Sequence, residues 1–245
     1  MPHRNPPPRP AAPQDRLTAC VVPALDGKQI DDVICGADFT VALSRRNNVV
    51  WSWGWGDFGR LGHGDKNDQT VPRPVRGLAS VTIASVACGD NHTLAATTDG
   101  QLFAFGRNQN GQLGLGHAND SLVPCPVAAL AGKKVTSVAC GAEHSLCSTE
   151  DHAVFAWGWG RYGNLGQGDC DDRSVPCPVD CRGVPAAAVV CGWRHSAVVT
   201  ADGDMWTFGW SKYGQLGHGD FVDHTKPKLV EGLRGCVAEA AGGWR

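Results

Sequence analysis

The stretch that decides the fold runs from Cys88 to Gly116 and reads CGDNHTLAATTDGQLFAFGRNQNGQLGLG. It opens on a Cys-Gly pair, alternates polar and apolar residues after a tight Asp-Gly turn, and closes in a glycine-rich loop. We predict short strands at residues 85–88, 92–96 and 101–105, and a fourth at 123–127 whose prolines suit only an edge strand. Four short strands in about fifty residues match one blade of a β-propeller.

The same stretch recurs along the chain with one period. A Cys-Gly or Gly-Gly pair begins at positions 35, 88, 140, 191 and 242. The leucine of a Gly-x-Leu-Gly-x-Gly motif lies at 61, 113, 165 and 216, and a proline lies at 72, 124, 176 and 227. Because three anchors share a period of about 52 residues, we predict an all-β chain in two parts. Residues 1–16 form a disordered proline-rich arm, and residues 17–245 form a partial β-propeller.

Composition narrows the function classes. The 245 residues include 32 Gly and 15 Pro, a density that long helices do not tolerate. The 22 basic and 24 acidic residues leave a net charge of −2, so we expect no direct nucleic-acid binding. No apolar run is long enough for a membrane span, and no secretory signal opens the chain. The 11 cysteines are therefore expected to be reduced thiols in the cytoplasm or nucleus.

Recurring histidines and cysteines have a structural explanation. His92, His144 and His195 follow the blade period, as do Cys88 and Cys140, so we interpret them as hydrogen-bonding and core residues. The glycine-rich loops lack the following helix and the Lys-Ser/Thr of a phosphate-binding loop. The sequence also lacks the paired CxxC motifs that are typical of a zinc site. We predict no enzyme activity, no catalytic residue, no metal and no cofactor.

Two kinds of tryptophan-rich segment carry a resemblance to a known family. Trp53-Gly-Trp-Gly-Asp-Phe-Gly-Arg-Leu-Gly-His-Gly64 typifies the first kind, and Gly192-Trp-Arg-His-Ser196, begun again at 243–245, typifies the second. The chain resembles the regulator of chromosome condensation repeat family, and within it the plant UV-B photoreceptors. That resemblance implies a seven-bladed propeller, of which this sequence holds about four and a half blades. We therefore expect a partial or truncated member.

The resemblance also implies a function without an added chromophore. The photoreceptors absorb UV-B through intrinsic tryptophans on one propeller face, and that face forms a homodimer held by salt bridges. Light releases monomers, which engage an E3 ubiquitin ligase of the photomorphogenesis pathway through a C-terminal tail. No such tail follows the last repeat of this sequence, which puts the ligase in doubt as a partner.

Individual positions match the functional residues of the photoreceptors. The chromophore tryptophans would be Trp193, Trp244 and Trp55, of which Trp55 would complete the cluster across the dimer. Four further tryptophans match antenna or packing positions: Trp53, Trp157, Trp159 and Trp210. Seven charged residues match the salt bridges of the dimer: Arg107, Arg194, Arg245, Asp57, Asp68, Glu143 and Lys212. Trp51 and Trp206 are expected to pack the blades, and Phe39 replaces the histidine of its repeat.

Two other functions remain open at this stage. The chain could be a light-insensitive propeller that serves as an interaction scaffold. It could also be a guanine-nucleotide exchange factor for a small GTPase, as the founding member of the family is. No repeat departs enough from 52 residues to hold a GTPase-facing insertion, which argues against the exchange factor.

Overall fold

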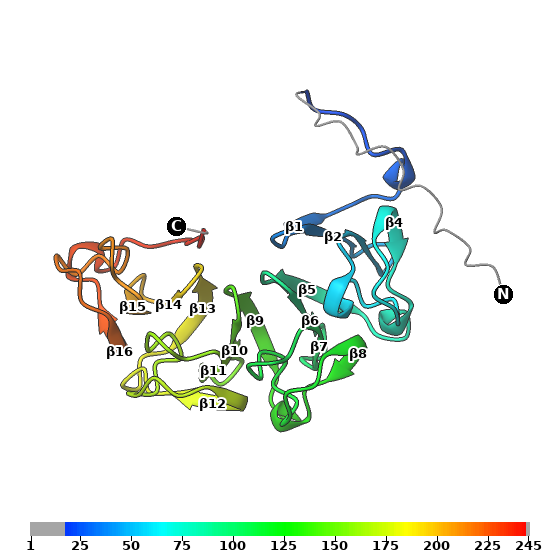
Figure 1. Ribbon diagram of the computed structural model, residues 1–245. Helices are drawn as coiled ribbons and strands as arrows, with labels where there is room; N and C mark the ends of the chain where they lie inside the picture. The colour runs from blue at the N-terminus through cyan, green and yellow to red at the C-terminus, as the bar shows by residue number, and fades with distance from the viewer. Residues whose placement is uncertain (1–17, 244–245) are drawn as a thin grey trace.

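A computed structural model describes residues 18–243 of the chain. The predicted arm at residues 1–16 lies outside this range, and so do Trp244 and Arg245. Within it, sixteen strands form four separate antiparallel sheets of four strands each. Figure 1 shows the sheets arranged in an arc around a common centre, with β1, β5, β9 and β13 innermost. The all-β propeller predicted from the repeats is confirmed.

Each sheet is one blade with its strands in chain order. Blade 1 holds β1 (Asp32–Cys35), β2 (Phe39–Ser44), β3 (Val49–Gly54) and β4 (Gln69–Pro74). Blade 2 holds β5 (Ile83–Cys88), β6 (His92–Thr97), β7 (Leu102–Gly106) and β8 (Ser121–Pro126). Blade 3 holds β9 (Val135–Cys140), β10 (His144–Thr149), β11 (Val154–Gly158) and β12 (Arg173–Val179). Blade 4 holds β13 (Ala186–Cys191), β14 (His195–Thr200), β15 (Met205–Gly209) and β16 (His224–Leu229).

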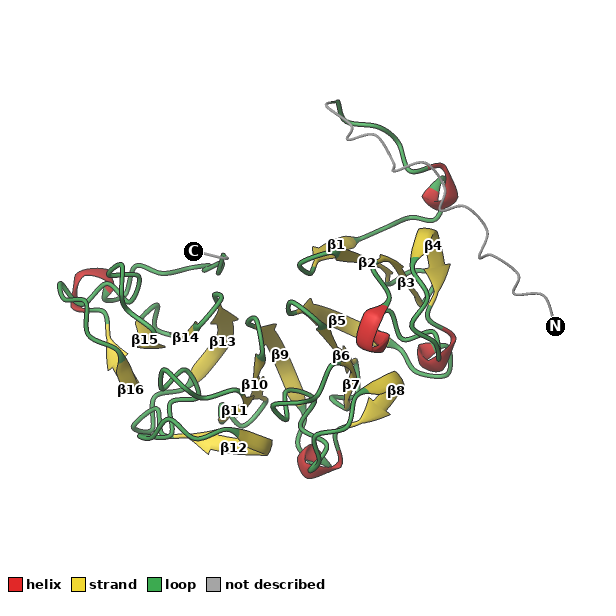
Figure 2. Cartoon of the chain, in the orientation of Figure 1, coloured by secondary structure: helices red, strands yellow, loops and turns green. Residues whose placement is uncertain are grey.

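Single turns of 3₁₀ helix join or follow some strands, as Figure 2 shows. They are η1 (Pro23–Leu25), η2 (Asp57–Gly59), η3 (Arg76–Leu78), η4 (Ala128–Leu130) and η5 (Glu231–Leu233). Between residues 18 and 243, no helix is long and apolar enough to cross a membrane.

The four strands predicted in the second repeat are confirmed within two residues at each end. The Asp99-Gly100 turn joins β6 to β7, where Gly100 takes a φ of 88° and its N–H donates to the Thr97 carbonyl at 3.0 Å. The proline-containing strand β8 pairs with β7 alone and is the outer edge of its blade.

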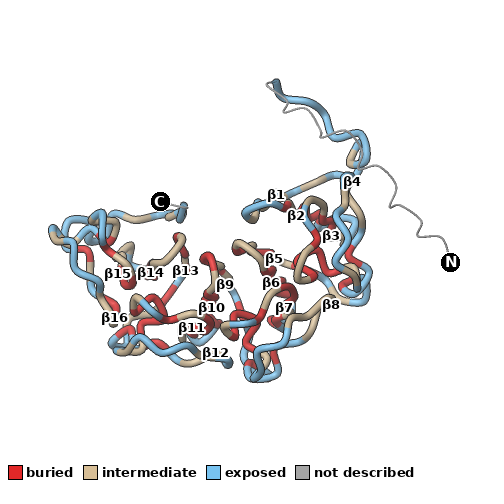
Figure 3. The backbone as a smooth tube through the Cα atoms, viewed as in Figure 1, coloured by how far each residue is buried: buried red, intermediate tan, exposed pale blue. Residues whose placement is uncertain are grey.

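Hydrophobic clusters lie between neighbouring blades. Figure 3 shows the buried residues, in red, along the strands of all four blades. Phe39 and Leu43 of blade 1 pack with Ile83 and Phe105 of blade 2 in one such cluster. Corresponding clusters join blade 2 to blade 3 and blade 3 to blade 4. Neighbouring blades therefore bury the faces that they turn toward each other, as stacked repeats do.

The Gly-x-Leu-Gly-x-Gly motif is explained by this packing. Gly62, Gly114 and Gly166 all have φ near +70°, in the left-handed region that favours glycine. A Cβ on any of them would approach an aromatic ring within 3 Å: Phe105, Trp157 and Phe208 respectively. The motif recurs because the loop must turn sharply against an aromatic side chain of the following blade.

Candidate functional site

Two sets of loops meet at one end of every blade. One set joins the first strand to the second, and the other follows the third strand. The same backbone hydrogen bond ties them in each blade: from Trp55 N to Asp38 O, from Arg107 N to Asn91 O, from Trp159 N to Glu143 O, and from Trp210 N to Arg194 O, all at 2.9–3.0 Å. We call this end of the propeller the loop face, and most of the predicted functional residues lie on it.

The Arg194 guanidinium is surrounded by aromatic rings on the loop face. Its Cζ lies 3.7 Å from the ring centroid of Trp193 and 4.9 Å from that of Trp159. The ring centroids of Tyr162 and Trp210 follow at 5.3 and 6.0 Å, and Arg194 Nη1 donates to the Tyr162 hydroxyl at 3.1 Å. These five residues from blades 3 and 4 form the Arg194 cluster. A cation this close to several ring faces is attracted by their quadrupoles.

The rings of the Arg194 cluster also contact one another. The centroids of Trp193 and Trp210 are 5.8 Å apart, and Tyr162 lies 5.4 Å from Trp159 and 5.7 Å from Trp210. Tyr213 extends the chain of rings, 5.5 Å from Trp210. Indole absorbs further toward the UV-B band than any other side chain. The indoles of the Arg194 cluster thus belong to one continuous set of ring contacts.

Trp55 lies in a second cluster, in blade 1. It is 42% exposed, whereas Trp193, Trp159 and Trp210 are partly buried. The Cζ of Arg60, a fully buried residue, lies 4.5 Å from the Trp55 ring centroid. Trp55 was predicted to complete the cluster of a second copy, and Arg60 was not among the predicted site residues. Arg60 could have been found in the sequence as a departure from the repeat. The corresponding positions hold the uncharged residues Gln112, Asn164 and Gln215.

The other predicted tryptophans separate into two groups. Trp159 and Trp210 join Trp193 in the Arg194 cluster. Trp157 is fully buried between blades 2 and 3, and its Nε1 donates to the Gln112 carbonyl at 2.9 Å, so it packs the fold. Trp53 is partly buried within β3. The packing role predicted for Trp51 and Trp206 is confirmed, since these side chains are 6% and 9% exposed.

Several of the predicted interface charges have partners inside the chain. Arg107 Nη1 lies 2.8 Å from Glu143 Oε1, and both side chains are 25% exposed. Asp68 Oδ1 accepts a hydrogen bond from Gly56 N at 2.9 Å, a contact that an aspartate repeats in each of the other blades. Lys212 is exposed, with its Nζ 5.6 Å from the Tyr213 ring centroid. Asp68 thus supports its own loop besides any role between two chains.

Charge is distributed unevenly over the loop face. At one repeat position blade 1 has Asp57, blade 3 has Arg161 and blade 4 has Lys212. At another, blade 1 has Asp38 and blade 4 has Arg194. The blade 1 side of the loop face is therefore acidic, and the blade 4 side is basic.

The recurring histidines link neighbouring blades. His92 Nε2 lies 2.9 Å from Ser145 Oγ, and His144 Nε2 lies 3.0 Å from Ser196 Oγ. Burial lowers the pKa of His92 to about 4 and that of His144 to about 3, so both rings are neutral at pH 7. The structural role predicted for them is confirmed. Burial likewise raises the pKa of the Cys88, Cys140 and Cys191 thiols, which keeps these thiols protonated.

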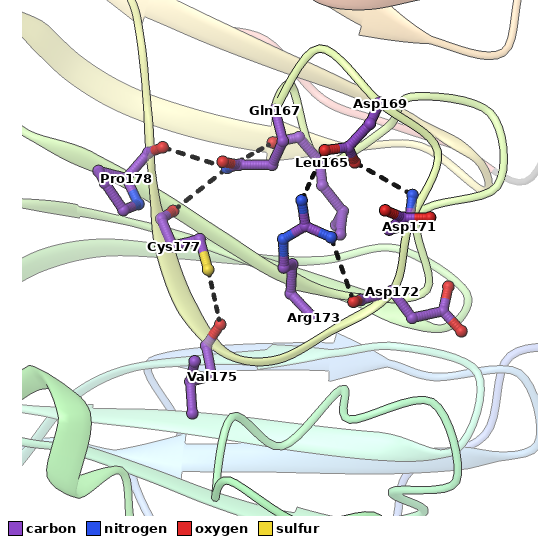
Figure 4. A network of polar contacts seen from close by, with 9 residues as sticks. All are labelled: Leu165, Gln167, Asp169, Asp171, Asp172, Arg173, Val175, Cys177 and Pro178. Atoms are coloured by element: carbon purple, nitrogen blue, oxygen red, sulfur yellow. Dashed lines mark hydrogen bonds and ion pairs between the residues drawn. The ribbon is translucent and has the colours of Figure 1, made fainter.

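An acidic loop in blade 3 also proves to be structural (Figure 4). Arg173 Nη2 donates to the Asp169 carboxylate at 2.6 Å, and the Asp171 N–H donates to the same side chain at 3.1 Å. Gln167 Nε2 donates to the Pro178 carbonyl at 3.1 Å and so ties the loop to β12. Across residues 18–243, no three His, Cys, Asp or Glu side chains gather in a way that would hold a metal ion.

Comparison with known proteins identifies the family. The family described as RCC1-like domain matches residues 5–187, and the regulator of chromosome condensation (RCC1) repeat matches residues 186–215 and 202–245. The chain belongs to the RCC1-like family. It is 51% identical over 234 residues to Ultraviolet-B receptor UVR8 of Arabidopsis thaliana, an alignment that covers 95% of this chain and 53% of UVR8. The chain thus spans about half the length of this curated relative.

Two solved structures have the same fold. The crystal structure of human WBSCR16 superimposes with a TM-score of 0.80 at 28% identity, over 88% of this chain and 56% of that one. Prp20p of Saccharomyces cerevisiae superimposes with a TM-score of 0.71 at 25% identity, over 82% of this chain and 50% of that one. The family resemblance and the propeller predicted from the sequence are confirmed.

Proposed function

We propose that the chain senses UV-B light through the indoles of its loop face. The observation that carries this proposal is the Arg194 cluster, in which one guanidinium lies within about 6 Å of three indole rings. Packing of the blades does not require this arrangement, because the interblade contacts use buried rings such as Trp157 and Phe208. The 51% identity to Ultraviolet-B receptor UVR8 supports the same function.

The loop face would also pair two copies of the chain. In a two-fold symmetric pair the same patch faces itself, so the acidic blade 1 side of one copy can meet the basic blade 4 side of the other. Asp57 and Asp38 would then approach Arg194 and Lys212 of the second copy. Complementary charges of this kind set the register of an interface and respond strongly to any change in one partner.

Light would act on the pair through Arg194. Excitation redistributes electron density within an indole, which changes the attraction between that ring and a guanidinium only 3.7 Å away. Arg194 cannot then hold its ring contacts and a carboxylate of the second copy equally well. Losing one partner of a desolvated ion pair leaves the other charge buried and unpaired, so the pair of chains would separate.

The released chain would present its loop face to a signalling partner. The partner class that the resemblance implies is an E3 ubiquitin ligase, met in the cytoplasm and nucleus. A fold alone does not carry a function, so this step depends on the loop face and not on the propeller as such.

The test is the molar mass of the purified chain, measured by size-exclusion chromatography with light scattering before and after a UV-B dose. We expect a dimer in the dark and a monomer after illumination. Trp193→Phe should abolish the change in mass, because it removes the indole closest to Arg194. Trp206→Phe is the matched control and should respond like the wild type, since Phe103 and Phe155 hold the corresponding positions in other blades.

Two results would contradict the proposal. A chain that is monomeric in the dark would exclude the pairing of two copies. A dimer whose mass ignores UV-B would exclude the sensor and favour a light-insensitive scaffold.

A further inference from the structure

Arg60 departs from its repeat in a way that demands an explanation. Its side chain is completely buried, although no salt bridge to it exists among residues 18–243. Gln112, Asn164 and Gln215, at the corresponding positions, are uncharged. A buried cation normally needs an ion-pair partner or several hydrogen bonds, so its presence in blade 1 alone indicates a specific use.

The surroundings of Arg60 are carbonyl groups and aromatic rings. Its Nε donates to the Asp57 carbonyl at 3.0 Å and its Nη1 to the Asp90 carbonyl at 3.4 Å, while Nη2 has no partner. The Arg60 Cζ lies 4.5 Å from the ring centroid of Trp55, 5.6 Å from that of Phe58 and 6.0 Å from that of Phe39. Burial lowers the pKa of Arg60, against the opposing effect of three nearby aspartates. A desolvated cation interacts with aromatic faces more strongly than an exposed one does.

Two of these rings are themselves departures from the repeat. Phe39 stands where blades 2, 3 and 4 have His92, His144 and His195. Phe58 has a φ of +61°, a left-handed conformation that is costly for a bulky side chain. The corresponding residues Asn110, Tyr162 and Tyr213 do not share it. Two exceptions to the repeat, Phe39 and Phe58, therefore lie near a third, Arg60, whose guanidinium also faces the indole of Trp55.

Phe58 extends this group toward the neighbouring blade. Its ring centroid lies 5.3 Å from the Cζ of Arg107 and 5.6 Å from that of Arg60, so one phenyl ring contacts two guanidinium groups. Arg107 in turn pairs with Glu143 at 2.8 Å. A continuous path of contacts thus runs from Trp55 to an ion pair between blades 2 and 3.

We infer that Arg60 is a positioning residue for Trp55. Its buried guanidinium holds the exposed indole in one orientation on the loop face, and Phe58 couples that orientation to the Arg107–Glu143 pair. This inference gives Trp55 an anchor within its own chain. Its relevance to light sensing rests on the proposed function, but the positioning itself does not.

The experiment is ¹⁹F NMR of the full chain containing 5-fluorotryptophan, recorded in the dark. The nine tryptophans give separate probes, and Trp55→Phe identifies the Trp55 resonance by its loss. Arg60→Gln installs the residue found in blades 2 and 4 and removes the cation. We expect it to shift the Trp55 resonance and to narrow its line as the indole gains freedom, while the Trp193 and Trp210 resonances stay in place. Arg60→Lys should return the Trp55 resonance part of the way toward its original position.

Two further variants separate positioning from other effects. Arg161→Gln removes an exposed positive charge from the same face and should leave the Trp55 resonance unchanged. Glu143→Gln should produce a smaller shift at Trp55 if the path through Phe58 exists. An unmoved Trp55 resonance in a folded Arg60→Gln chain would overturn the inference. A shift shared by all resonances would also overturn it, because that pattern reports general loosening.

The readout distinguishes this inference from the proposed function. A chain that ignores UV-B can still show the Trp55 shift, and a light-responsive chain can lack it. Acrylamide quenching of Trp55, taken as the difference between the wild type and Trp55→Phe, gives a second measurement. We expect greater quenching in Arg60→Gln than in the wild type, with Arg60→Lys between them.

Discussion

The loop face holds two arginine-centred clusters that are built in opposite ways. Arg60 belongs to the loop after the third strand of blade 1 and is fully buried beneath an exposed indole. Arg194 belongs to the loop between the first two strands of blade 4 and lies partly exposed among partly buried indoles. In one cluster the cation is fixed and the indole faces solvent. In the other the cation and the indoles around it are all partly exposed, so the cation can reach a partner.

The difference indicates that the two arginines have separate roles. A guanidinium without access to solvent can position a neighbouring ring but cannot exchange partners with a second molecule. A partly exposed guanidinium can do both, and that is the property that a light-controlled ion pair requires. If this interpretation is correct, disturbing Arg60 should change stability and the orientation of Trp55. Disturbing Arg194 should change association and leave the folded chain nearly as stable.

Lowering the pH should destabilise the contact between blades 3 and 4. His144 links blades 3 and 4, which carry the Arg194 cluster, through Ser196, whereas Phe39 holds the corresponding position in the blade of Trp55. The folded chain keeps His92 and His144 neutral, with pKa values of about 4 and about 3, while the unfolded chain binds protons below about 6.5. The contribution of these neutral histidines to the free energy of unfolding is therefore fully present above pH 7 and is lost as the pH drops. The loss at pH 5 should be about 2 kcal/mol for each histidine, or about 4 kcal/mol for both.

Urea unfolding at pH 7 and pH 5 measures this loss. His144→Phe, which copies blade 1, should remove about half of the pH dependence whatever its effect at pH 7. In ¹⁹F spectra the Trp193 resonance should broaden at a higher pH than the Trp55 resonance. Equal unfolding free energies at the two pH values would exclude neutral buried histidines as the cause.

Replacing Arg60 or Arg194 with alanine should lower the free energy of unfolding by different amounts. Arg60→Ala leaves a cavity and removes two hydrogen bonds to carbonyl groups, so we expect a loss of about 3 kcal/mol in unfolding free energy. Arg194→Ala removes a partly exposed side chain whose ring contacts water can replace in part, and should cost about 1 kcal/mol. Urea unfolding of the monomer at pH 7 measures both losses. A larger loss for Arg194 than for Arg60 would reverse the roles that we assign to them.

The blades and the Arg194 cluster could largely be predicted from the sequence, but the cluster of Arg60 and Trp55 could not. Anchors at a constant spacing define the blades, and Trp193-Arg194 shows as an adjacent pair within one repeat. Arg60 lies five positions after Trp55, and only the turn of η2 with its left-handed Phe58 brings the guanidinium under the indole. Arg107 and Glu143 are 36 residues apart and meet only because neighbouring blades place their loops side by side. Repeats predict the framework well, and the role of their exceptions becomes clear only from contacts in the folded chain, both within a blade and between blades.

The smallest expected effect concerns the ion pair beside Phe58. Arg107 and Glu143 are both 25% exposed, so solvent screens much of their attraction. A double-mutant cycle with Arg107→Gln and Glu143→Gln should give a coupling energy of about 0.5–1 kcal/mol in the unfolding of the monomer. A coupling energy of this size would show that Arg107 and Glu143 form their ion pair within one chain, as in the structure.

The same cycle also tests where the pair acts. If the two residues instead bridged two copies, the coupling would vanish from monomer unfolding and appear in the dimer dissociation constant, where it would weaken with added salt. Lys212→Gln provides the reference, because Lys212 is exposed and forms no salt bridge among residues 18–243. It should leave monomer stability unchanged and alter only the salt dependence of association. Arg107 would then act on the Arg60 side of the loop face and Lys212 on the Arg194 side, which is the division that the two clusters predict.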